Sequence, residues 1–140
     1  MTISELNAVR NLYERKRDVE WHLADLRQAA ENLVPERDGM PHGTTISSRV
    51  EGLALKIVEL GKEIIALCEQ MNVAAARLSD ALQELLHGEE LRIMTLRYVA
   101  CKRWLDIFSE LKISDARGFH IHRIALKKVK QSKVSYSKLE

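Results

Sequence analysis

The sequence predicts an all-α protein in which a long antiparallel helical hairpin is followed by three short helices. Apolar residues recur at spacings of three and four over long stretches, which is the periodicity of amphipathic helices. Aromatic residues make up only 5% of the 140 residues and there are two prolines, a composition that does not favour a β-rich fold. We therefore expect a hairpin at 1–86, a three-helix module at 87–130 and a disordered basic tail at 131–140.

The first long helix is predicted to end before Pro35, because proline removes a backbone donor and disfavours helix at the preceding residue. Lys16 interrupts its apolar stripe. The connector at 34–47 is rich in Gly, Pro, Ser and Thr, and contains the turn Gly39-Met40-Pro41-His42-Gly43. The stripe itself consists of Val9, Leu12, Val19, Leu23, Leu26, Ala30 and Leu33.

The second long helix carries a heptad stripe over about five heptads, which is typical of coiled-coil-like packing. Ser48-x-x-Glu51 matches a capping box and places the start near Ser48, while Gly88 suits the position after the helix end. Two such helices around a turn should form an antiparallel hairpin. The stripe comprises Val50, Leu53, Ile57, Leu60, Ile64, Leu67, Met71, Ala74, Leu78, Ala81 and Leu85.

The apolar surface of the second helix is wider than one partner helix would cover, and the first helix is shorter. We expect the C-terminal part of the second helix to lack a partner within the chain, so that burial of its apolar area favours a second copy. A homodimer with four helices is the expected assembly. A higher oligomer, and a monomer in which the C-terminal module folds back, remain alternatives. The expected interface comprises Leu60, Ile64, Leu67, Met71, Leu78, Leu82 and Leu85.

Residues 91–130 are expected to form three short helices. Ser114 stands at the expected N-cap of the third helix, and Asp115 then lies where negative charge favours the helix dipole. Two short helices joined by about three residues, the second of them basic, are the outline of a helix-turn-helix. The apolar faces of the three helices comprise Leu91, Met94, Leu96, Tyr98 and Val99; Trp104, Ile107, Phe108 and Leu111; and Ile121, Ala125 and Val129.

Four motifs of this segment resemble region 4 of sigma-70 family factors: Leu96-Arg97-Tyr98, Trp104-x-Asp106-Ile107, Leu111-x-Ile113-Ser114 and Ile121-His122-x-x-Ala125-Leu126-Lys127-Lys128. Together with the turn at 39–43 and Ser48-Arg49-Val50, they are more closely similar to a group of phage and prophage proteins of uncharacterised function. The resemblance covers roughly residues 38–58 and 91–130. It implies a role in the regulation of phage transcription.

The chain departs from the usual helix-turn-helix pattern at three positions. Phe108 occupies the helix crossing where Ala is common, and Lys112 occupies the turn where Gly supplies a positive φ. Gly118 replaces an early Val or Ile of the third helix, where Gly costs about 1 kcal/mol relative to Ala. We expect Phe108 and Gly118 to compensate each other, with the large ring filling the space of the missing side chain. The alternative is a module that no longer binds DNA.

Charge is divided unevenly along the chain. Residues 1–86 carry a net charge of −4 and residues 87–140 a net charge of +6, and no acidic residue occurs from Ala116 to Leu139. A concentrated basic segment favours phosphate contact. We expect Lys127, Lys128 and Lys130 to contact phosphates of double-stranded DNA, and the outward-facing Arg117, His120 and Arg123 to face base edges in the major groove.

The sequence shows no pattern that would support catalysis or cofactor binding. No Gly-rich phosphate loop, nucleophile elbow or zinc-ligand cluster occurs, and His120-x-His122 would place its two rings on different sides of a helix. No run approaches the roughly 18–20 apolar residues of a membrane span. The first residues do not resemble a secretory signal, and Cys68 and Cys101 suit a reducing compartment. We expect a non-enzymatic bacterial cytoplasmic protein without metal, cofactor or small-molecule substrate.

Two other functions fit the same features. The chain could be an adaptor whose coiled-coil hairpin binds RNA polymerase or another phage protein, with a vestigial helix-turn-helix. It could also resemble a small terminase subunit of DNA packaging, which combines a helix-turn-helix with an oligomerising helical region in a ring.

Overall fold

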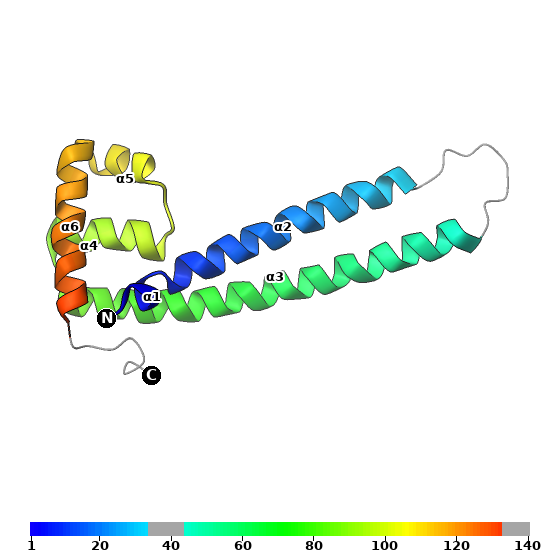
Figure 1. The fold of residues 1–140 in the computed structure, drawn as a ribbon, viewed down its shortest axis with the longest axis horizontal. Helices are drawn as coiled ribbons and strands as arrows, with labels where there is room; N and C mark the ends of the chain where they lie inside the picture. The colour runs from blue at the N-terminus through cyan, green and yellow to red at the C-terminus, as the bar shows by residue number, and fades with distance from the viewer. Residues whose placement is uncertain (34–43, 133–140) are drawn as a thin grey trace. The chain divides into compact units, whose positions relative to one another are not determined.

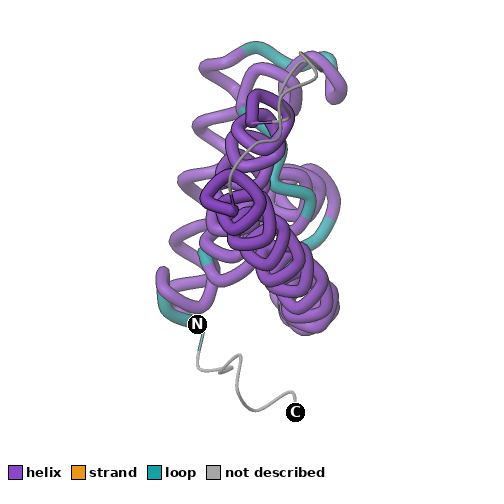
Figure 2. Tube along the Cα trace, turned by 90° about the vertical axis from the view of Figure 1, so that its right-hand side faces the viewer, coloured by secondary structure: helices purple, strands orange, loops and turns teal. Residues whose placement is uncertain are grey.

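The computed structural model describes residues 1–33 and 44–132, with residues 44–47 described by their backbone only, and all regular elements in these ranges are helical (Figure 2). The predicted all-α class is confirmed for this part of the chain. Pro35, the turn at 39–43 and residues 133–140 of the predicted tail lie outside it. The elements are α1 (Ile3–Leu6), α2 (Ala8–Leu33), α3 (Thr44–Leu85), α4 (Gly88–Met94), the π-helical segment η1 (Thr95–Val99), α5 (Trp104–Leu111) and α6 (Asp115–Gln131) (Figure 1).

The chain divides into two compact units. Of the described residues, one unit contains 1–13 and 70–132, which we call the terminal unit, and the other contains 14–33 and 44–69, which we call the hairpin unit. The sequence-based boundary between residues 86 and 87 lies inside the terminal unit. α3 is thus shared between the two units, because its C-terminal part packs with the helices that follow it.

The predicted start of the second long helix near Ser48 is wrong. α3 begins at Thr44, so that Ser48-x-x-Glu51 lies within the helix and residues 44–47 of the expected connector are helical. The predicted end is close to the observed one, since α3 ends at Leu85 and Gly88 takes a φ of +60°. The short helix α1 was not expected, although Thr2 and Glu5 form a reciprocal capping box there.

The larger core of the terminal unit surrounds the last turns of α3. Leu78, Ala81 and Leu82 have no exposed surface, and Leu86 is 1% exposed. The expectation that this part of the helix lacks a partner within the chain is therefore wrong: α1, the start of α2, α4, η1 and α6 cover it. Leu78 and Leu82 consequently have no surface to offer to a second copy. The other buried members of this core are Met1, Leu6, Val9, Met94, Tyr98, Ala125 and Val129.

The hairpin unit contains residues 14–33 of α2 and the part of α3 up to Glu69. Arg15 of α2 and Glu63 of α3 form an ion pair of 3.5 Å, and Leu23 and Leu67 are buried. Large apolar side chains nevertheless remain exposed. These are Leu55 (65%), Val58 (54%) and Ile65 (62%) on α3 and Trp21 (73%) on α2.

Candidate nucleic-acid interface

α6 begins where the sequence predicts, because Ser114 caps it. The Ser114 hydroxyl accepts a hydrogen bond from the backbone N–H of Arg117 at 3.2 Å, and Asp115 is the first helical residue. α5 ends at Leu111, and the next residue, Lys112, adopts the left-handed conformation with φ 56° and ψ 45°. A non-glycine residue thus makes the turn between the two helices. In Figure 1, α6 runs across α4, and α5 lies beside the start of α6.

Gly118 lies directly beneath the ring of Phe108. A Cβ atom at Gly118 would lie against Cε1 of Phe108, with Cδ1 at 2.6 Å and Cζ at 2.7 Å, which is closer than real Cβ contacts. The predicted compensation is therefore observed: the ring fills the space that a side chain at residue 118 would take. Phe108 and Ile107 are buried together with Ile93 in the second core of the terminal unit.

Aromatic rings continue from this contact to the surface. Trp104 stacks on Phe108 with a centroid distance of 5.6 Å and meets Phe119 edge-on at 5.3 Å. Phe108 and Phe119 also meet edge-on, at 5.0 Å. Arg97 lies 4.6 Å over the Trp104 ring, and its Nη1 donates to the Lys102 carbonyl at 3.0 Å. These contacts fix α6 against α5 and η1.

Tyr98 of η1 holds the other side of α6 through His122. The Tyr98 hydroxyl lies 2.8 Å from Nε2 of His122, and the two rings stack with centroids 5.9 Å apart. Burial, together with the Arg97 charge, lowers the pKa of His122 from its ordinary 6.5, which favours the neutral ring as an acceptor for the hydroxyl. Burial raises the pKa of Tyr98, so the hydroxyl keeps its proton. His122 is thus a packing residue of the module.

The outward face of α6 lies opposite its buried residues Gly118, Ala125 and Val129. Ala116, His120, Arg123 and Lys127 follow each other at spacings of four, three and four along it, and Lys130 adjoins them. All five are exposed. Nε of Arg123 donates to the carbonyl oxygen of Phe119 at 3.4 Å, so that the Arg123 side chain lies back along the helix. No ion pair within the described residues engages Arg123, Lys127 or Lys130.

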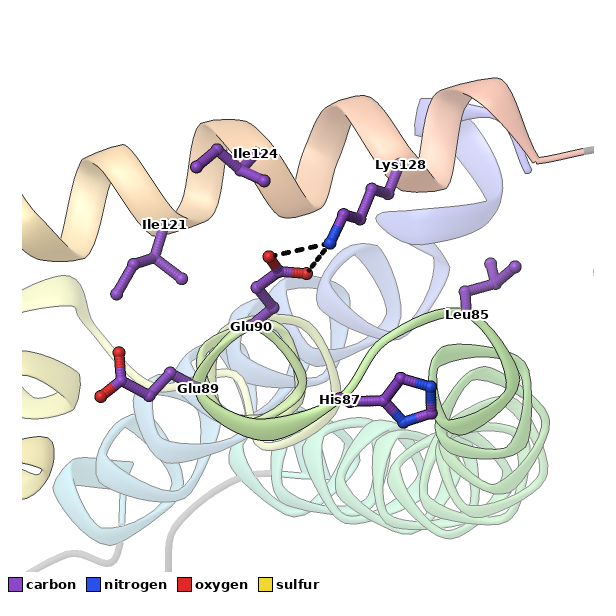
Figure 3. A pocket seen from close by; sticks show the side chains of 7 residues that line it. All are labelled: Leu85, His87, Glu89, Glu90, Ile121, Ile124 and Lys128. Atoms are coloured by element: carbon purple, nitrogen blue, oxygen red, sulfur yellow. Dashed lines mark hydrogen bonds and ion pairs between the residues drawn. The ribbon is translucent and has the colours of Figure 1, made fainter.

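Arg117 and Lys128 instead face α4. Nη2 of Arg117 lies 3.0 and 3.1 Å from the two carboxylate oxygens of Glu89, and Nζ of Lys128 lies 2.8 and 3.0 Å from those of Glu90 (Figure 3 shows the second pair). Arg117, which the sequence predicts to face base edges, is thus paired with Glu89 in the structure. The sequence pattern could not indicate these pairs, because their partners are 28 and 38 residues apart.

A cavity of about 380 Å³ lies between α4 and α6, next to the Lys128–Glu90 pair (Figure 3). Its walls consist of the apolar side chains of Leu85, Ile121 and Ile124 together with those of His87, Glu89 and Glu90. The basic groups of α6 on this side are neutralised by Glu89 and Glu90, so the cavity offers no net attraction to phosphate. The exposed basic face of α6 is therefore the better candidate for contact with a polyanion.

No group of three or more potential metal ligands occurs in the described ranges, and no helix in them is long and apolar enough to cross a lipid bilayer. Comparison of the chain with models of protein families, with curated proteins and with solved structures gives no match.

Proposed function

We propose that this protein is a DNA-binding regulator of phage or prophage transcription. In this proposal α4, η1, α5 and α6 form a sigma region-4-like helix-turn-helix, and α6 enters the major groove of double-stranded DNA. The observation that carries the proposal is the exposed row of His120, Arg123 and Lys127 on α6. These side chains lie on the side of the helix away from the core, within a segment that contains no acidic residue from Ala116 to Leu139.

The residues of α6 differ in the contacts they can make. Lys127 and Lys130 are exposed and suit phosphate contacts, which set affinity, while His120 and Arg123 lie nearer the N-terminus of α6 and suit base edges. Arg117 and Lys128 would have to exchange Glu89 and Glu90 for phosphate before they could contribute. We therefore assign them a secondary role in DNA binding.

The hairpin of α2 and α3 is proposed to join two copies of the chain. The apolar side chains exposed in the hairpin unit, Leu55, Val58 and Ile65, would become buried in the dimer, which favours association. Leu60, Ile64 and Met71, which are only partly exposed, would lie at the edge of the same interface. A dimer would present two copies of α6 to two half-sites of an operator.

Charge reversal in the full-length protein tests the proposed function. Arg123→Glu should abolish binding to duplex DNA from phage promoters, as measured by fluorescence anisotropy. Arg27→Glu makes the same change at an exposed position of α2 and should leave binding intact. Equal affinity of the Arg123→Glu variant and the unmodified protein would contradict the proposal.

An adaptor function is the second candidate, and the pairing of Arg117 with Glu89 and of Lys128 with Glu90 favours it, because these pairs lower the positive charge that α6 offers. In that case the hairpin would bind RNA polymerase or another phage protein. Retention of a partner by the Arg123→Glu variant, together with a lack of DNA binding by the unmodified protein, would support the adaptor.

A further inference from the structure

Phe119 is an apolar side chain at the edge of an otherwise polar and basic helix face. The residue is 40% exposed, and its neighbours on the outward side of α6 are Ala116, His120 and Arg123. Residues four apart lie one above the other on a helix, and the Nε of Arg123 reaches the Phe119 carbonyl at 3.4 Å. Any ligand that Arg123 contacts therefore lies next to this ring.

The ring of Phe119 is held in place by α5. It meets Phe108 edge-on at 5.0 Å with an interplanar angle of 86°, and Trp104 at 5.3 Å with an angle of 60°. Phe108 is itself buried and lies over Gly118, so the Phe119 ring packs against a side chain of the core. An apolar group that is fixed in this way loses little conformational entropy when a ligand covers its exposed part.

The major groove of DNA offers one apolar group at its base edges, the 5-methyl group of thymine, and phenylalanine is one of the side chains that suit it. We propose that Phe119 is a specificity-determining residue whose ring packs on a thymine methyl group, beside the base or phosphate that Arg123 contacts. This inference rests on the proposed DNA binding by α6. It adds that the preferred site contains a thymine at the position next to Arg123.

Replacement of thymine by deoxyuridine tests the inference, because it removes the methyl group and keeps every hydrogen-bonding group of the base. The probe is a duplex enriched from a random-sequence pool by the full-length protein, with each thymine replaced in turn. Loss of one buried methyl group should weaken binding of the unmodified protein about fourfold at the contacted position. Equal affinity for all the deoxyuridine duplexes would overturn the role of Phe119 and leave the proposed function standing.

Variants then assign the methyl contact to Phe119. Phe119→Ala should bind the thymine duplex about as weakly as the unmodified protein binds the deoxyuridine duplex, and should not discriminate between them. Ile124→Ala is the matched control, since Ile124 is 38% exposed on the opposite edge of α6 and should keep the discrimination. Persistence of discrimination in Phe119→Ala would contradict the inference. If Phe119→Ala does not fold, Phe119→Leu replaces it, and the deoxyuridine series still decides with the unmodified protein.

The salt dependence of binding separates this role from a phosphate contact. Phe119→Ala should keep the slope of log affinity against log salt concentration. Lys127→Ala should reduce the magnitude of this slope by about 1, because one phosphate contact is lost. Failure of the pool to yield any enriched duplex would instead contradict the proposed function itself. The two failures are therefore distinguishable.

Discussion

Gly118 and Phe108 occupy one shared space, because a Cβ atom at Gly118 would come within 2.6 Å of Cδ1 of the Phe108 ring. The two residues join α5 to α6 at the helix crossing. A glycine within a helix normally destabilises it by about 1 kcal/mol, and here the Phe108 ring fills the space that a side chain would take. The contact also fixes the exposed Phe119 ring, so that the packing of the module and its proposed DNA-binding face depend on each other.

Substitutions at these two positions should be coupled. Gly118→Val alone should destabilise the protein by about 1–3 kcal/mol, since the ring cannot move without disturbing the core. Phe108→Ala alone should cost about 3–5 kcal/mol. The double variant Phe108→Ala/Gly118→Val should lose less than the sum, with a coupling of about 0.5–3 kcal/mol in urea unfolding. Additive losses would show that the two residues do not share space.

Lys112 is expected to be a site of backbone strain in the turn before α6. The left-handed conformation that it adopts costs an L-residue about 1–2 kcal/mol, and glycine does not bear this cost. Glycine also makes the unfolded chain more flexible, which offsets part of the gain in stability. Lys112→Gly should therefore raise the free energy of unfolding by up to about 1 kcal/mol. Lys112→Ala is the control, because it removes the charge and keeps the strain. A variant Lys112→Gly that is no more stable than Lys112→Ala would contradict this account.

Glu89 and Glu90 should weaken DNA binding, because they occupy the charged groups of Arg117 and Lys128. Glu89→Gln and Glu90→Gln should each raise affinity for duplex DNA roughly two- to fivefold, in keeping with the small free energy of exposed ion pairs. Anisotropy titrations at fixed salt measure this change. Glu84→Gln, an exposed position of α3 with the same change of charge, should have a smaller effect. Unchanged affinity in both α4 variants would argue that Arg117 and Lys128 stay away from DNA.

Acid should destabilise the terminal unit through His122. Its pKa is lowered in the folded protein, so the unfolded chain takes up the proton first as the pH falls through 6.5. The contribution of His122 is complete above about pH 6.5 and is lost as the pH falls towards the lower pKa of the folded state. Titration of the imidazole by NMR should give a folded-state pKa below that of an unfolded peptide. A pKa at or above the peptide value would contradict the burial-based account.

The exposed apolar stripe of the hairpin unit should set the oligomeric state. Leu55→Lys combined with Ile65→Lys should convert a dimer of about twice 16.0 kDa into a monomer in sedimentation experiments, because charged groups would replace the buried area. Leu105→Lys is the matched control, since Leu105 is 70% exposed on α5 of the other unit. A monomeric unmodified protein would contradict the proposed dimer. A ring of eight or more copies would favour the DNA-packaging alternative.

The sequence predicted correctly those features that are determined by residues close together in the chain. The cap at Ser114, the apolar spacing of Trp104, Ile107 and Phe108, and the helix end near Gly88 are all observed. Thr2 and Glu5 form a capping box at α1, which is another local signal of this kind. The capping box at Ser48 was misleading, because the helix continues in the N-terminal direction to Thr44.

Contacts between distant segments could not be predicted in the same way. A heptad stripe shows which residues are buried but does not show what covers them, and Leu78 and Leu82 are covered by the chain itself. The pairs Arg117–Glu89 and Lys128–Glu90 depend on how α6 crosses α4. The sequence does not indicate Phe119 as a site residue, because a single apolar residue within a basic helix resembles part of the core until its exposure is known.

The salt dependence of DNA binding by the full-length protein tests the central proposal most directly. Anisotropy titrations with promoter duplexes at two salt concentrations would measure it. The exposed Lys127 and Lys130 predict about two phosphate contacts for each copy of α6, and hence a slope of log affinity against log salt of about −2 per module. Tight binding at low salt that weakens with this slope would support a DNA-binding regulator. No binding of the full-length protein at low salt would contradict it.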